Sequence, residues 1–287
     1  MTEQDMQDLQ CAARILEFPT FTAQVSKVIG KPAELTLKSL PAPVKSKVGE
    51  YTQACFEAAF RVVLLTVDTK KRFKKASNLL HKGLVVATGA TGGFFGGATM
   101  AAELSLSTGI MMRSIAEVAR EEGEDLTAVE SRLACIAVLG LDTSNITGTE
   151  KIDTSRYFLI RRAMADELTT AAEYLASNTV TDETAPIVAK FLNKIAERFG
   201  IQLTEKMVAE LVPVIGAVTA ASLNYLFIAH FQRIARGHFM IRRLERVYGK
   251  ERIKIEYEAA LARMKDQSPN DDIVDVEREV AATNEDG

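Results

Sequence analysis

The residues best suited to acid–base or anion-binding chemistry lie in one predicted helix towards the C-terminal end. His238, Arg242 and Glu245 are four and three residues apart, so a helix places them on one face. They could bind a phosphate or a lipid headgroup there, or form an ion network on the helix surface. His230 lies eight residues before His238, about 80° away around the helix axis. Because histidine pairs that bind metal are usually four residues apart, as in HExxH, we predict no metal site.

A second candidate polar cluster surrounds Glu103, the only charged residue within residues 83–112. A buried charge is costly unless it is paired, and arginines further along the chain are candidate partners. We hypothesise that Glu103, Arg113 and Glu117 form a polar cluster, with Asn224 contributed by a facing helix. The alternative is a buried ion pair that fixes the register of the helices.

No recognised catalytic motif accompanies either cluster. The chain has no G-x-S-x-G nucleophile elbow and no Cys/His pair at a recognised spacing. We therefore predict no catalytic residue and no cofactor, and the sequence favours a protein without enzymatic activity. The alternative is a peptidase-like hydrolase with an acidic and histidine site.

The glycine-rich stretch GLVVATGATGGFFGGAT, residues 83–99, looks at first like a phosphate-binding loop. No two of its glycines are two residues apart, so G-x-G-x-x-G is absent, and no second strand follows. A helix fits better, because small residues four apart form a smooth strip that a second helix can approach closely. The other uncharged segment, residues 211–229, offers a similar small face. The expected packing positions are Gly89, Gly92, Gly93, Gly96, Gly97, Gly216 and Ala220.

Both uncharged segments, residues 83–102 and 211–229, are close to the length of a bilayer span. We expect them to form two antiparallel central helices buried in a bundle; the alternative is that they sit on a membrane or partly enter it. Basic residues near the first segment would attract anionic headgroups by about 1 kcal/mol each, unless they form only a solvated helix face. The residues expected to contact a membrane or another anion are Lys70, Lys71, Arg72, Lys74 and Lys75.

The composition favours a helical, intracellular protein. The 287 residues allow a large core, and their charges, 35 Lys plus Arg against 38 Asp plus Glu, argue against nucleic-acid binding. The three cysteines, Cys11, Cys55 and Cys135, are widely spaced, which predicts buried thiols in a reducing compartment. From the polar, acidic N-terminal residues we expect no secretory signal peptide. We therefore expect a cytoplasmic protein, either free or held on the inner face of the cell membrane.

Apolar residues at spacings of three and four predict an all-α fold: a single bundle-like domain, residues 1–265, around the two central segments. The acidic residues 266–287 are expected to be a disordered tail. Gly123 and Gly249 are expected to end helices. Outside the central segments, the predicted helices include residues 3–17, 44–67, 125–141, 154–177, 182–199, 204–211 and 250–265, with a loop at 142–153.

Two long motifs resemble a known family. The stretch GGFFGGATMAAELSLSTGIMMRSIAEVAREEGEDL, followed by RLACIAVLGL, is similar to the central signature of the EcsC family. So is VPVIGAVTAASLNYLFIAHFQRIARGHFMIRRLERVYG, and the resemblance covers about residues 10–250. The family is mainly bacterial and all-helical, and its founding member is membrane-linked and encoded beside an ABC transporter. The resemblance therefore implies an all-helical fold and membrane association rather than a particular chemistry.

Together, the motifs and the resemblance predict a peripherally membrane-associated accessory protein. Its expected partners are an anionic membrane surface or a membrane protein such as a transporter, with no nucleic acid. A purely soluble scaffold is the remaining alternative.

Overall fold

The computed structural model describes residues 1–18, 21, 42, 47–60, 62–63, 97–143, 155–177, 185–211 and 220–266. Within these residues the regular elements are all helical and no strand occurs, so the predicted all-α fold is confirmed. The helices are α1 (Glu3–Glu17), α4 (Val48–Phe60), α6 (Gly97–Glu121), α7 (Val129–Ala137), α8 (Arg156–Ser177), α9 (Pro186–Leu211), α10 (Ala220–Tyr248) and α11 (Lys250–Asp266), with a short 3-10 helix, η3 (Val138–Gly140).

Helix α1 lies against α10 and starts and stops where the sequence predicts. The side chain of Thr2 caps its first turn by accepting a hydrogen bond from the Asp5 backbone N–H at 3.1 Å. Gly237 of α10 brings the two helices close together, because a Cβ atom at this position would lie 2.9 Å from Cγ of Leu16. The helix ends before Pro19, as expected of a residue that cannot continue a helix.

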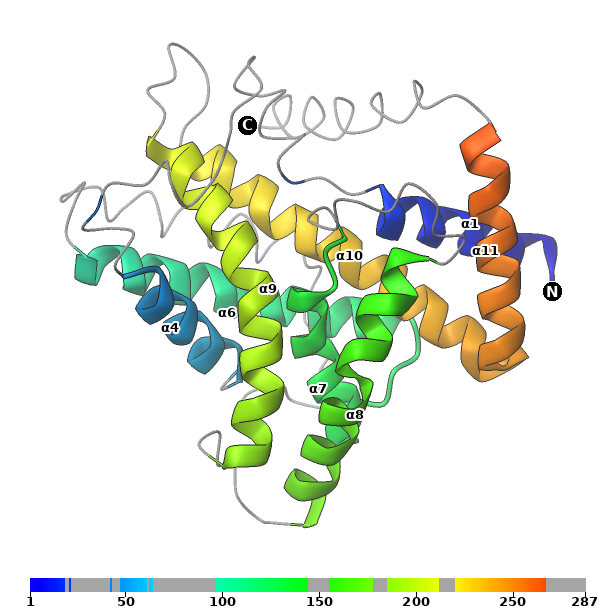
Figure 1. The fold of residues 1–287 in the computed structure, drawn as a ribbon, viewed down its shortest axis with the longest axis horizontal. Helices are drawn as coiled ribbons and strands as arrows, with labels where there is room; N and C mark the ends of the chain where they lie inside the picture. Colours follow the sequence, from blue (N-terminus) through cyan, green and yellow to red (C-terminus); the bar gives the residue numbers. More distant parts are fainter. Residues whose placement is uncertain are drawn as a thin grey trace.

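The two central helices, α6 and α10, run in the same direction. Ser114 of α6 accepts a hydrogen bond from Gln232, and further along Glu122 accepts one from Arg243 at 2.9 Å. Partner numbers therefore rise together along both helices, and both first turns lie at the end of the longest axis opposite α11 (Figure 1). The described parts of the two central segments thus differ from the antiparallel expectation, which rested on their composition and not on any contact.

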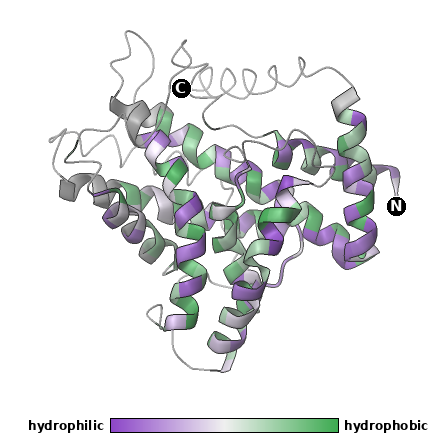
Figure 2. Ribbon diagram, in the orientation of Figure 1, coloured by the Kyte–Doolittle hydropathy of each residue, from purple (hydrophilic) through white to green (hydrophobic). Residues whose placement is uncertain are grey.

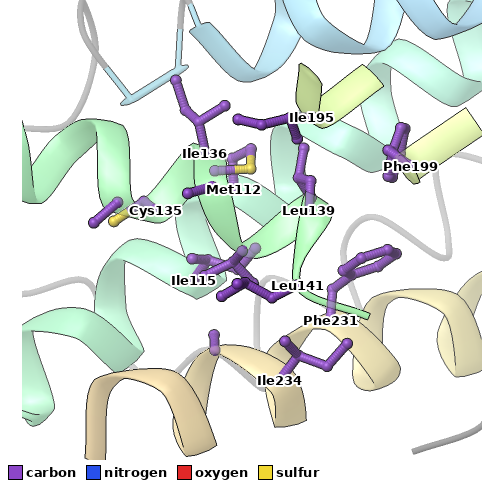
Figure 3. Packing of buried hydrophobic residues seen from close by; sticks show 14 of the residues in the cluster. Met112, Ile115, Cys135, Ile136, Leu139, Leu141, Ile195, Phe199, Phe231 and Ile234 are labelled. Atoms are coloured by element: carbon purple, nitrogen blue, oxygen red, sulfur yellow. The ribbon is translucent and has the colours of Figure 1, made fainter. Parts of the chain in front are cut away.

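The hydrophobic core lies where α6, α7, η3, α9 and α10 meet. Figure 3 shows side chains from all of these elements turned towards one another, and those it labels are fully buried. Along each helix, hydrophobic and hydrophilic residues alternate on the helical period (Figure 2), so that one side is buried and the other faces water. The labelled core residues are Met112, Ile115, Cys135, Ile136, Leu139, Leu141, Ile195, Phe199, Phe231 and Ile234.

Several predicted helix boundaries are wrong: α4 begins at Val48 rather than at residue 44, α9 begins at Pro186 rather than at residue 182, and two further differences have a clear cause. Helix α9 continues through residues 199–204, where a break was expected, because Phe199 and Leu203 are fully buried and hold the segment in the core despite Gly200. Helix α7 begins at Val129 rather than at residue 125. The Asp125 carboxylate accepts hydrogen bonds from the backbone N–H and the hydroxyl of Thr127, which forms a turn in place of a first helical turn.

The helix ends predicted at Gly123 and Gly249 are confirmed, but the prediction that all three cysteines are buried is wrong. Gly123 and Gly249 follow α6 and α10 with φ of 78° and 87°, the left-handed conformation that favours glycine. Cys55 and Cys135 are buried, whereas Cys11 is exposed, because it lies on the side of α1 opposite the buried Leu9 and Leu16.

Most of the predicted small-residue strip lies outside the described residues. Gly97 begins α6 and Ala220 begins α10, and the intervening small-residue contact stays a prediction. The tail after residue 266 also lies outside them, as do all five basic residues expected to contact a membrane. In the part of the chain that the structure describes, no helix has the length and hydrophobicity needed to cross a bilayer. The strip positions outside the described residues are Gly89, Gly92, Gly93, Gly96 and Gly216, and the basic positions are Lys70, Lys71, Arg72, Lys74 and Lys75.

Candidate functional site

A buried polar group connects α10 to α8. The Glu245 carboxylate accepts two hydrogen bonds from the Arg161 guanidinium, at 2.7 and 2.6 Å, in a bidentate ion pair. The same guanidinium lies 3.4 Å from the hydroxyl oxygen of Tyr157, one helical turn earlier on α8. Since the Glu245 side chain is only 7% exposed, this pair is largely removed from water.

His238 completes this group from about two turns earlier on α10. Its Nδ1 atom lies 2.8 Å from the Tyr157 hydroxyl oxygen, and the imidazole is buried. Burial lowers the pKa of His238 well below its usual value, and the charges of Arg161 and Arg242 lower it further. The imidazole is therefore neutral near pH 7, and its Nε2 atom makes no hydrogen bond with the described residues.

The N-terminal end of α8, which carries Tyr157, is fixed by a buried carboxylate from α1. Glu17 accepts hydrogen bonds from the backbone N–H groups of Arg156 and Tyr157, at 3.2 and 3.1 Å, and one from the Ser155 hydroxyl. A carboxylate at this position satisfies free N–H groups of the first turn and complements the helix dipole. Glu17 therefore positions Tyr157 in front of His238.

A second ion-pair group lies one turn further along α10. Arg242 donates to both carboxylate oxygens of Glu124, at 2.8 and 3.1 Å, and Arg246 and the Ser131 hydroxyl donate to the same carboxylate. Burial alone would raise the pKa of Glu124, but the hydrogen bonds and the charges of both arginines lower it below its usual value. This carboxylate therefore ties α10 to the connection between α6 and α7.

The structure brings together only part of the two predicted clusters. His238, Arg242 and Glu245 do share one face of α10, but each contacts a different neighbouring residue rather than one another. Asn224 is also buried on α10, about 21 Å before His238 at 1.5 Å per residue.

The cluster predicted around Glu103 does not form one site. Because α6 is continuous, Glu103 and Glu117 are about 21 Å apart along its axis. The hypothesis that they share a cluster with Arg113 is therefore wrong for this pair. Glu117 instead pairs with Arg120 at 2.5 Å, one turn further on, and Arg113 lies between the two acidic residues on the same helix.

The described residues hold no group of three or more histidine, cysteine or acidic side chains placed to bind a metal ion. Burial raises the pKa of Cys135 to about 12 and that of Cys55 to about 11, so both thiols are protonated near pH 7. A protonated, buried thiol is a poor nucleophile.

The family model for the EcsC protein family matches residues 12–244, most of the chain. The chain belongs to the EcsC family. No curated protein and no solved structure matches it. In this EcsC protein, the matched segment includes Glu17, Glu124, Tyr157, His238 and Arg242.

Sequence reasoning missed a third buried polar group in this EcsC protein. Nε2 of His230 lies 2.6 Å from the Asp142 carboxylate, and both side chains are only 1% exposed. Arg198 of α9 donates at 2.6 Å to the backbone carbonyls of Gly140 and Asp142. His230 was considered in the sequence analysis, but its partner Asp142 begins the polar stretch 142–153, for which only a loop was predicted.

Tyr157, Arg161 and Glu124 of the EcsC protein were missed for a similar reason. Tyr157 and Arg161 are four residues apart, so a helix places them on one face, and this spacing was the available signal. Nothing in the spacing relates them to α10, whose His238 lies 81 residues away in sequence.

Proposed function

We propose that this EcsC protein is a non-enzymatic accessory protein that attaches peripherally to an anionic membrane surface, acting through lipid or a membrane protein such as a transporter. The observation that carries the proposal is the sequence order of a basic cluster, Lys70–Lys75, followed by the twenty uncharged residues 83–102. Basic residues beside an apolar segment combine electrostatic and hydrophobic attraction to a bilayer.

The arrangement of α6 and α10 supports this proposal. Because both helices run in the same direction, the uncharged stretches that lead into them join the described fold at one end of its longest axis (Figure 1). Residues 83–96 connect to the first turn of α6, and residues 212–219 connect to the first turn of α10. A single end of the protein would then carry the membrane contact.

The buried ionisable groups support a structural rather than a catalytic use. Glu245 is held by Arg161, Glu124 by Arg242, and His230 by Asp142, and each of these contacts joins two elements of the bundle. Removing one partner of such a buried pair destabilises the fold, and groups paired in this way are poorly placed to exchange protons with a substrate.

Vesicle cosedimentation tests the proposal. The wild-type protein should sediment with phosphatidylglycerol-containing vesicles, less so with neutral phosphatidylcholine vesicles, and high salt should release it. When the basic cluster is substituted, vesicle binding should weaken by more than about tenfold, because each lost charge removes about 1 kcal/mol of attraction. The substituted residues, all changed to Gln, are Lys70, Lys71, Arg72, Lys74 and Lys75.

A matched variant controls for the loss of five positive charges. Exposed basic residues of α8, α9 and α11 can be replaced by Gln instead, and this variant should bind vesicles nearly as well as wild type. Equal binding to anionic and neutral vesicles, or no binding to either, would contradict the proposal. The control positions are Arg162, Lys190, Lys250, Arg252 and Arg263.

A further inference from the structure

The Nε2 atom of His238 is a buried polar atom whose hydrogen-bonding role can be assigned. The Tyr157 oxygen accepts from Arg161 at 3.4 Å, and among the described residues the only acceptor within reach of its O–H is Nδ1 of His238 at 2.8 Å, so the O–H donates to Nδ1. Burial raises the pKa of Tyr157 to about 12, so the hydroxyl keeps its proton. A neutral imidazole that accepts at Nδ1 carries its own proton on Nε2. Nε2–H is therefore a buried donor that has no hydrogen-bond acceptor among the described residues.

The surroundings of this donor favour an acceptor that carries negative charge. The guanidiniums of Arg161 and Arg242 both act on the imidazole, and together they disfavour a positive charge on it. The two largely buried guanidiniums, of Arg161 and Arg242, are each paired with one buried carboxylate, Glu245 and Glu124, and Arg246, which is 42% exposed, shares Glu124. Glu130 lies 3.9 Å from Arg242 but is mostly exposed, so water and salt screen its charge.

Two of the side chains beside the imidazole are partly exposed to solvent. The side chains of Arg161 and Arg242 are 21% and 18% exposed, while the imidazole beside them is buried. Arg242 uses Nε and Nη2 for Glu124, which leaves the Nη1 group directed towards the exposed Glu130. A guanidinium with one side held by a carboxylate can offer its remaining N–H groups to a second anion.

We propose that His238, Arg161 and Arg242 form a binding site for a phosphate group, between α8, α10 and the connection from α6 to α7. Nε2–H of His238 donates to one phosphate oxygen and Nη1 of Arg242 to another, while Arg161 supplies positive charge and holds Tyr157. The site lies away from the end of the protein proposed to contact a membrane, so it does not depend on that contact. The phosphate group is either a free phosphate or the headgroup of a lipid.

Histidine NMR on the wild-type protein tests this site without any mutation. The chain has only three histidines, so ¹⁵N-histidine labelling gives a simple spectrum in which each tautomer is recognised. The resonance of His238 should report a neutral ring protonated on Nε2, and adding inorganic phosphate should shift it while chloride at equal ionic strength does not. A second titration uses short-chain phosphatidic acid that stays monomeric.

Each outcome of the titrations decides the proposal. A shift with inorganic phosphate supports a site for free phosphate, and a shift with phosphatidic acid alone supports a site for a lipid headgroup. A His238 resonance that neither compound moves overturns the proposal, even if the protein binds vesicles as proposed above. A ring protonated on Nδ1 overturns it as well, because Nε2 would then be an acceptor.

A pair of arginine variants provides a second test. Arg242→Gln should weaken binding of the compound that shifts His238 by about tenfold or more, the effect of losing a charge-assisted hydrogen bond. Arg236→Gln removes the same charge from the same helix at a side chain that is 55% exposed, and should leave binding unchanged. Equal binding by both variants would contradict the assignment of Arg242. Circular dichroism on each variant shows whether the fold is retained.

Discussion

Nδ1 of His238 lies 2.8 Å from the hydroxyl oxygen of Tyr157, and this one contact joins the beginning of α8 to the middle of α10. Both side chains are buried, and Tyr157 also packs against Tyr257 of α11, with ring centroids 5.9 Å apart. The hydrogen bond therefore lies where α8, α10 and α11 meet. Its loss should lower the stability of the protein.

Tyr157→Phe is expected to lower the free energy of unfolding by about 1–3 kcal/mol, because it leaves the buried Nδ1 of His238 without a donor. Urea denaturation followed by circular dichroism measures this change. Tyr248→Phe is the matched control: it also removes a hydroxyl, here one bonded to Asp5 at 2.7 Å, but at a partly exposed site. If both variants lose the same free energy of unfolding, burial does not increase the contribution of the Tyr157 hydroxyl to stability.

Glu245→Gln should lower the free energy of unfolding by roughly 3 kcal/mol, because it leaves the largely buried Arg161 guanidinium without its carboxylate. The double variant Arg161→Met with Glu245→Gln should recover part of this loss, since no unpaired charge then remains. Glu173→Gln on the exposed side of α8 should change stability little. A double variant less stable than Glu245→Gln alone would show that the unpaired charge is not the cause.

The helices of this protein were largely predictable because their apolar residues follow the helical period. Leu9, Ala13 and Leu16 of α1 are all buried, as their spacing predicts. The break expected after residue 199 failed because glycine disfavours a helix by only about 1 kcal/mol relative to alanine, and burial of Phe199 and Leu203 outweighs it. Local propensity is a weak guide wherever tertiary packing decides.

The candidate site was only half predictable for a different reason. His238 and Arg242 were found because spacing along one helix shows which residues share a face. Their partners Tyr157 and Glu124 lie 81 and 118 residues away in the chain, and local spacing carries no information about such contacts. The error at Glu103 and Glu117 has the same origin. The two residues are neighbouring charges in a sequence with few charges, but on one continuous helix they lie far apart in space.

Gly237→Ala should destabilise the protein by about 1–3 kcal/mol, because the new Cβ atom would lie 2.9 Å from Cγ of Leu16. Gly49→Ala is the matched control within a helix, at a position where a Cβ atom meets nothing within 4 Å, and should stabilise by up to about 1 kcal/mol. Thermal unfolding distinguishes these opposite signs. A partial rescue of Gly237→Ala by Leu16→Ala would identify Leu16 as the source of the clash.

The buried neutral state of His238 predicts a pH dependence of folding between about pH 7.5 and 5.5, where carboxylates with ordinary or lowered pKa values do not titrate. The pKa of His238 is well below 6.5 in the folded protein, and the unfolded chain has the ordinary value. As the pH falls below 6.5, the unfolded chain therefore binds a proton that the folded protein does not, so stability is lost with decreasing pH.

The slope from this one group should approach about 1.4 kcal/mol per pH unit below pH 6.5. Urea denaturation of the wild type and of His238→Phe across this range measures it, and the difference in stability between the two proteins should shrink as the pH falls. His230→Phe removes the other histidine of α10 and tests whether the dependence belongs to position 238. A wild type and a His238→Phe variant with parallel pH profiles would mean that His238 takes up its proton equally in both states, and the neutral imidazole assigned to the phosphate site would be wrong.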